Sequence, residues 1–281
     1  MNYTEFMNAM LCEIRGQVDA QVRTELYTVT KNNGTRRTGI LFKQEDSNLA
    51  PTIYLAVLLI IVGSFRNLTF LPVIIGNTLI GIYQEIRVKK TCDCQNLFDF
   101  NHVKEHIVYK LIRRDANEEL LKQIPYEPFL DLAVVYYIQI DNTRFGSAAI
   151  QIRNEHLRYW RVEKEEIRRL AEKNTPRIYP VQIRQIVRFM YVATNEQCSL
   201  GAAVMRYPDF REKVRGMIRG DFYILPSSIH EVILVPESFG LEPERMQEMV
   251  KEINQTGVAL EEVLSDSVYY FDGEEIRIVA K

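Results

Sequence analysis

The chain has 281 residues, of which 47% are hydrophobic and 26% are charged, and its formal net charge is −2. This composition is typical of a globular protein with one large or two modest domains, and it excludes the basic excess on which nucleic-acid affinity depends. Four cysteines do not predict a disulfide framework in a chain of this size, and the first residues do not resemble a signal peptide. We therefore expect a cytoplasmic protein with no nucleic-acid partner.

The N-terminal part is predicted to begin with one helix and one β-hairpin. A plausible Thr4 N-cap and apolar residues on one side predict a helix over residues 4–17. Alternating polar and apolar residues predict a strand over 22–30, with a returning strand over 35–43. Asn33-Gly34 predicts the turn between them, because a type I′ turn needs positive φ angles.

Two apolar segments follow, at residues 53–62 and 68–83. The first is shorter than the roughly 20 apolar residues of a membrane-spanning helix, and residues 63–67 separate it from the second. The second has apolar residues at helical spacing, which indicates a helix buried in a core or at a dimer interface. A membrane-associated hairpin is the alternative, and we expect the soluble arrangement.

The remaining chain is predicted to mix hairpins with single helices. Helices are expected at 101–114, 117–123, 154–174 with a break near Val162, 208–219 and 243–255. Strands are expected at 130–140, 145–152, 189–194, 201–207, 222–225, 230–235, 268–271 and 276–279. This order predicts an α+β fold with mixed, largely antiparallel sheets and helices packed on them. Prolines 125 and 128 mark the expected boundary between an N-terminal region, 1–125, and a C-terminal domain, 126–281.

Polar residues precede the predicted strand at 230–235, in the run Leu225-Pro226-Ser227-Ser228-Ile229-His230-Glu231. Ser228 and His230 are two residues apart, so on an extended strand they would point the same way. A serine beside an imidazole is the starting arrangement for nucleophilic catalysis. Polar side chains at the start of a strand also commonly bind backbone groups, and we favour this structural role.

Cys198 is a second candidate nucleophile, because residues 195–198 are predicted to lie in an exposed hairpin loop. Glu231 or Asp266 could assist His230 in a hydrolase that uses Ser228 or Cys198. No Gly-x-Ser-x-Gly motif accompanies these residues. The chain therefore leaves catalysis as an alternative to binding.

Cys92, Cys94, His102 and His106 form the one candidate metal site. The histidines are four residues apart and would share a helix face, and thiolates with imidazoles suit tetrahedral zinc. Cys-x-Cys is tighter than the usual spacing of structural zinc ligands, however, and residues 101–106 also read as a solvated helix face. No glycine-rich phosphate-binding motif is present. We expect no metal and no cofactor.

Several short segments together resemble a bacterial family of unknown function, found mostly in anaerobic gut Firmicutes of the Lachnospiraceae type and often near mobile-element genes. These segments are Lys31-Asn32-Asn33-Gly34, Ala50-Pro51-Thr52-Ile53-Tyr54-Leu55, Asp131-Leu132-Ala133-Val134-Val135-Tyr136, Met190-Tyr191-Val192-Ala193-Thr194-Asn195, Gly201-Ala202-Ala203, Leu225 to Pro236 and Leu264-Ser265-Asp266-Ser267-Val268-Tyr269. The C-terminal half also looks distantly like a second uncharacterised bacterial α+β family. The resemblance implies no established activity.

One departure from the family pattern concerns the segment after Leu55. The resemblance implies a charged helix there, whereas this chain continues with seven apolar residues. An apolar surface in place of a solvated one indicates a partner surface. Its expected residues are Val57, Leu58, Leu59, Ile60 and Ile61. We therefore predict a non-enzymatic accessory protein that binds another protein or itself.

Overall fold

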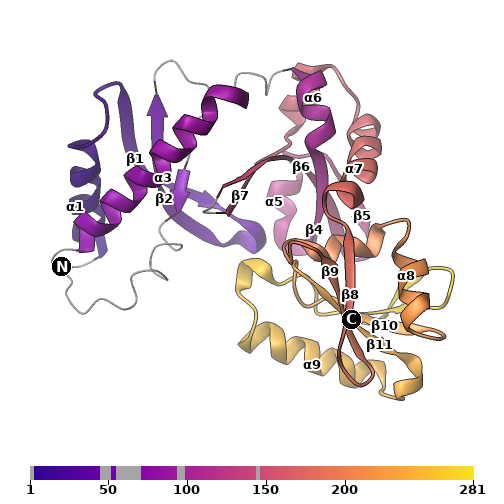
Figure 1. Ribbon diagram of the computed structural model, residues 1–281. Coiled ribbons are helices and arrows are strands. Elements are labelled where there is room, and N and C mark those ends of the chain that lie inside the picture. The colour runs from indigo at the N-terminus through magenta and orange to yellow at the C-terminus, as the bar shows by residue number, and fades with distance from the viewer. Residues whose placement is uncertain (1–2, 45–51, 55–70, 94–98, 144–145) are drawn as a thin grey trace. The chain divides into compact units, whose positions relative to one another are not determined.

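The computed structural model describes residues 3–44, 52–54, 71–93, 99–143 and 146–281 (Figure 1). The chain divides into two compact units. The first contains residues 1–31, 35–97 and 143–146, and the second contains residues 32–34, 98–142 and 147–281. The boundary expected after residue 125 lies inside the second unit. The strands β4 (Ile107–Arg113) and β5 (Tyr126–Phe129) flank this boundary, and both pair with β6 (Leu132–Thr143) in one sheet.

The first unit is a three-stranded antiparallel sheet with two helices on one face (Figure 1). Its elements are α1 (Tyr3–Arg15), β1 (Val22–Thr30), β2 (Arg36–Gln44), β3 (Thr52–Tyr54) and α3 (Leu71–Asp93). Alternate residues of a strand point to the same face of the sheet. Thr24 of β1 and Phe42 of β2 are partners in the strand register, so they lie side by side on the buried face. The Phe42 ring stacks on Tyr83 of α3 at 4.5 Å between centroids. This stacking joins α3 to the sheet.

The second unit contains a four-stranded antiparallel sheet built around β6. Its strands are β4 (Ile107–Arg113), β5 (Tyr126–Phe129), β6 (Leu132–Thr143) and β7 (Gly146–Gln151), and the short elements beside them are α4 (Phe100–Val103), η3 (Lys104–His106), η4 (Asp115–Asn117) and α5 (Glu118–Leu121). Helices α6 (Asn154–Trp160) and α7 (Lys164–Ile178) follow. Buried Asn174 of α7 donates hydrogen bonds to the carbonyls of Lys104 and Ile107, at 2.8 and 3.0 Å. These bonds fix the start of β4 against α7.

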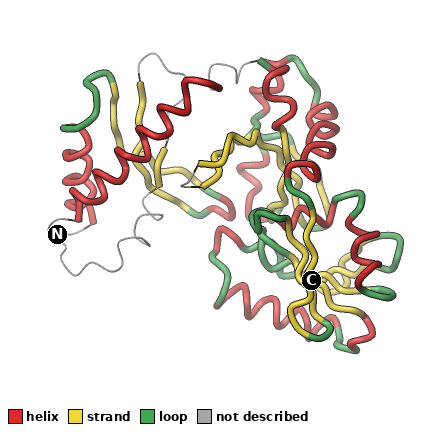
Figure 2. Tube along the Cα trace, viewed as in Figure 1, coloured by secondary structure: helices red, strands yellow, loops and turns green. Residues whose placement is uncertain are grey.

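A six-stranded antiparallel sheet forms the rest of this unit, in the order β13-β12-β10-β11-β9-β8. Strands are drawn in yellow in Figure 2. Its strands are β8 (Val181–Val187), β9 (Met190–Asn195), β10 (Phe222–Leu225), β11 (Val232–Pro236), β12 (Val268–Phe271) and β13 (Ile276–Ala280). Between them lie η5 (Gly201–Arg206), α8 (Phe210–Met217), η6 (Glu237–Phe239), α9 (Pro243–Thr256) and η7 (Leu260–Glu262). Met246 and Val250 of α9 pack on Leu225, Val235 and Val268 of the sheet. Strands β8 and β13 end the strand order given above, so they are the two edges of the sheet among the strands that the structure describes.

The predicted α+β class with antiparallel sheets is confirmed. The β1–β2 hairpin, α9 and the β12–β13 hairpin lie where the sequence predicted them. The charged stretch over 154–174 is interrupted close to Val162, as predicted, because Arg161 ends α6 with a φ of 55°. Hydrophobic periodicity and turn residues were sufficient to predict these elements.

Three segments have a different structure from the one predicted for them. The predicted helix over 101–114 ends early and becomes β4, where the run Ile107-Val108-Tyr109 is buried in the sheet. The predicted strand over 201–207 is η5. The proline loop at 125–128 is largely strand β5, which tolerates Pro128 because β5 ends the order β4-β6-β5.

Candidate functional site

The predicted Ser228–His230 pair lies at the start of β11, and its polar groups bind other segments of the second unit. The Ser228 hydroxyl accepts a hydrogen bond from the His230 backbone N–H at 3.1 Å. His230 Nδ1 accepts the Leu200 backbone N–H at 3.2 Å, and Nε2 lies 3.5 Å from Glu262 Oε1. The His230 carbonyl accepts the Thr194 hydroxyl at 2.7 Å. One residue thus joins the β9–η5 loop, the start of β11 and η7.

This set of contacts limits what His230 can do chemically. A general base needs a free lone pair directed at the nucleophile that it activates. The lone pair of Nδ1 is used by the Leu200 amide, and in the neutral ring the proton on Nε2 faces the Glu262 carboxylate. The geometry favours an anchoring role for His230.

The other proposed catalytic residues have separate surroundings. Cys198 is an exposed free cysteine with a φ of 50°. It lies in a turn whose backbone groups form hydrogen bonds with the buried side chain of Asn195. Glu231 is half-buried at the start of β11. Asp266 forms an ion pair with Arg113 at 2.8 Å and accepts a hydrogen bond from Asn254 at 2.8 Å. Asp266 therefore helps to join β4 to the segment before β12.

The candidate zinc ligands are only partly described. Cys94 lies outside the described residues, and nothing is described of the Cys92 side chain in α3. His102 lies in α4 and His106 in η3. Among the residues that the structure describes, no three His, Cys, Asp or Glu side chains are grouped so as to hold a metal ion.

The expected partner surface, residues 57–61, also lies outside the described ranges. Within those ranges, no helix combines the length and apolar character needed to cross a membrane.

The sequence analysis missed a carboxylate that joins two distant segments of the second unit. Asp131 Oδ2 accepts the hydroxyls of Ser265 and Ser267 at 2.7 and 2.8 Å, and Oδ1 accepts the Tyr269 hydroxyl. Burial, with Asp131 beside it, raises the pKa of Tyr269 well above its usual value, so the phenol remains a donor. The spacing of these three hydroxyl residues is the available signal, because alternate residues of an extended chain share one side. All three donors serve to join this segment to the start of β6.

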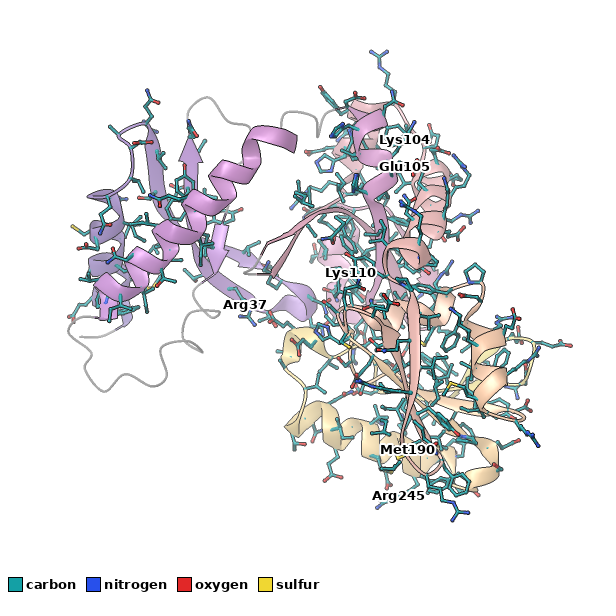
Figure 3. All side chains as sticks on the ribbon, in the orientation of Figure 1. Arg37, Lys104, Glu105, Lys110, Met190 and Arg245 are labelled. Atoms are coloured by element: carbon teal, nitrogen blue, oxygen red, sulfur yellow. The ribbon has the colours of Figure 1, made fainter. Side chains whose placement is uncertain are left out.

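A second missed feature is the turn between β8 and β9. Arg188 and Phe189 form this two-residue turn, and Phe189 has a φ of 66°. The second position of such a turn normally takes Gly or Asn, because a bulky side chain is strained at positive φ. Met190, which begins β9 directly after the turn, is labelled in Figure 3.

Exposed apolar side chains lie on the β8–β9 hairpin and on η6, whose Phe239 contacts Phe189. We call them the hairpin patch, which comprises Ile186, Val187, Phe189 and Phe239. Ile186 and Val187 are 54% and 55% exposed. Phe189 and Phe239 are 36% and 45% exposed, and their ring centroids are 5.8 Å apart. Arg188 lies over the Phe189 ring at 4.8 Å. Clustered exposed aromatic and β-branched side chains are typical of interaction surfaces.

Comparison with known families identifies the family to which the chain belongs. The chain matches a family described as a family of unknown function (DUF5688), over residues 3–190 and 187–273. The chain belongs to DUF5688. The two matched stretches overlap at residues 187–190, within the β8–β9 hairpin. No curated protein and no solved structure matches the chain.

DUF5688 is a family of unknown function, as the resemblance found in the sequence implied, and membership assigns no activity. Several segments that carried the resemblance form side-chain hydrogen bonds with distant parts of the chain. They include the Asn33 turn, the Asp131 strand, the His230 region and the segment from Leu264 to Tyr269. Because these segments form internal hydrogen bonds and the family assigns no activity, the exposed side chains are the remaining guide to function.

Proposed function

We propose that this protein is a cytoplasmic, non-enzymatic binding protein that associates with another protein through the hairpin patch. The observation that carries the proposal is Phe189, an aromatic residue at a positive φ in an exposed two-residue turn. The left-handed conformation costs an L-residue roughly 1–2 kcal/mol, which Gly would avoid. Strained residues of this kind cluster at functional positions.

The composition of the patch supports protein association. Aromatic side chains that remain exposed supply large contact areas, and they dominate the energetics of many protein interfaces. Ile186 and Val187 extend this apolar area onto the end of the edge strand β8. The contacts of His230, by contrast, support a structural role for Ser228 and His230, two residues that a hydrolase would use.

Photochemical crosslinking in the native host tests this function. Val187 is replaced by benzoylphenylalanine, and Leu260 of the same unit, which is 67% exposed, receives the same group as a control. We expect a discrete protein adduct from position 187 and none from position 260. Adding Phe189→Gly should reduce the adduct by about thirtyfold, because loss of an aromatic anchor costs about 2 kcal/mol of binding.

Phe189→Gly also separates binding from folding. Gly relieves the positive φ, so we expect the free energy of unfolding to be retained or to rise by up to about 1 kcal/mol. Ile253→Ser, which removes another half-exposed apolar side chain, should leave the adduct unchanged. Absence of any adduct at position 187, or an adduct that Phe189→Gly leaves undiminished, would overturn the proposal.

A further inference from the structure

We infer that the partner binds as an extended, acidic segment that adds a strand to the free edge of β8. This inference rests on the proposed function and specifies its partner. Strand β8 pairs with β9 on one side and with no described strand on the other. Every second residue of such an edge turns its N–H and C=O groups outward, where an extended chain can pair with them.

The side chains of β8 leave this edge accessible. Gln182, Arg184 and Gln185 are exposed, and Ile186 and Val187 are more than half exposed. The register with β9 shifts between Gln185 and Val187, so consecutive residues at this end are exposed. An incoming strand would therefore meet backbone groups along β8 and the apolar patch at its end.

The charge of the edge selects the chemistry of the partner. Residues 181–190 contain Arg184 and Arg188 and no acidic residue. Both arginines are exposed, and Arg184 makes no ion pair with any residue that the structure describes. Complementary charge favours glutamate or aspartate in the added strand, since opposite charges on neighbouring strands stabilise their pairing.

The same charges disfavour a second copy of this chain at the edge. Two antiparallel copies of β8 paired about its central residue would place Arg184 of one copy opposite Arg184 of the other. Like charges directly opposite each other destabilise a strand pair. An acidic segment of a different protein meets both the backbone and the charge requirements.

Synthetic peptides test the inference with the full chain. One probe is an eight-residue peptide in which glutamate alternates with valine, and its counterpart has lysine in place of glutamate. We expect the glutamate peptide to bind about tenfold more tightly at low salt, with the difference reduced at high salt. Hydrogen exchange should show new protection of the amides of residues 181–187. A glutamate peptide N-methylated at alternate residues should not bind, because it cannot pair with the edge.

Charge-matched variants provide the control. Arg184→Glu with Arg188→Glu should invert the preference between the two peptides. Lys173→Glu with Lys251→Glu, which makes the same change of charge at exposed positions on α7 and α9, should leave it unaltered.

The outcomes separate this inference from the proposed function. Equal binding of both peptides, or binding of the N-methylated peptide, overturns the inference. An adduct at Val187 without peptide binding also overturns it and leaves the proposed function standing. An adduct of twice the mass of the chain identifies a second copy at the edge, which again overturns the inference. Loss of both peptide binding and the adduct removes both proposals.

Discussion

At the scale of single residues, Gly201 shows how tightly the His230 region is packed. A Cβ atom at this position would lie 2.5 Å from the His230 carbonyl oxygen and 2.8 Å from the Asn195 amide nitrogen. Both are backbone atoms that cannot move without disturbing β9 and β11. We therefore expect Gly201→Ala to lower the free energy of unfolding by about 3 kcal/mol, as overpacking of a core does. Urea unfolding followed by circular dichroism measures this change.

Gly216 in α8 is the matched control for this substitution. A Cβ atom there would meet nothing within 4 Å, and the residue has no positive φ. Gly216→Ala should stabilise the protein by about 0.5 kcal/mol, because Ala is the better helix former. Equal unfolding midpoints for Gly201→Ala and the unmodified protein would contradict the packing argument.

The candidate site was predictable only in its local part. Polar residues before a strand predicted that Ser228 and His230 need partners, and both have them. The partner of the imidazole is Leu200, thirty residues away, and only the folded chain brings the two together. The Asp131 carboxylate was missed for the same reason, since its donors lie more than 130 residues away.

At the scale of elements, α6 contains a titratable group in its first turn. His156 Nδ1 accepts the Arg153 backbone N–H at 3.1 Å, and its ring lies 5.3 Å from that of Trp160. Burial, followed by the positive charge of Arg153, lowers the pKa of His156 below 6.5. The unfolded chain therefore binds this proton at a higher pH than the folded chain does. This contribution to stability is complete above about pH 6.5 and is lost as the pH falls through the folded pKa.

Replacement by glutamine tests this pH dependence. His156→Gln keeps an acceptor at the third position of the helix, where glutamine suits a capping box, and it does not titrate. We expect similar stability at pH 7 and a shallower loss of stability between about pH 6.5 and 5. Urea midpoints measured across this range provide the comparison. Superimposable pH profiles for the two proteins would show that His156 contributes nothing.

Element prediction succeeded where local pattern and tertiary environment agree. The β1–β2 hairpin has both alternation and a turn signal, and it was predicted correctly. The amphipathic pattern over 101–114 predicted one helix, but burial of Ile107 and Val108 between neighbouring elements determined a strand from residue 107 onward. Strand β8 was not predicted, because an exposed edge strand shows little contrast between its two faces.

At the scale of the whole molecule, the second unit joins parts of the chain more than 200 residues apart. Asn33 Nδ2 donates to the carbonyls of Leu260 and Val263 at 2.8 and 2.7 Å, and Asn33 also exchanges hydrogen bonds with Asn117. Asn33 tolerates its φ of 55° better than most residues do. The Asn-Gly pair that predicts a simple hairpin turn therefore also connects distant segments of this unit.

Two substitutions at Asn33 separate its hydrogen bonds from its backbone conformation. Asn33→Gly keeps the positive φ without strain but leaves two carbonyls without donors, which should cost about 2 kcal/mol. Asn33→Ala loses the same bonds and adds left-handed strain, so its cost should be about 1 kcal/mol larger. Hydrogen exchange of the amides of residues 260–264, with urea unfolding, measures both effects. If Asn33→Gly leaves this exchange unchanged, the long-range bonds do not stabilise the unit, whereas equal losses for both variants would show that the backbone conformation costs nothing.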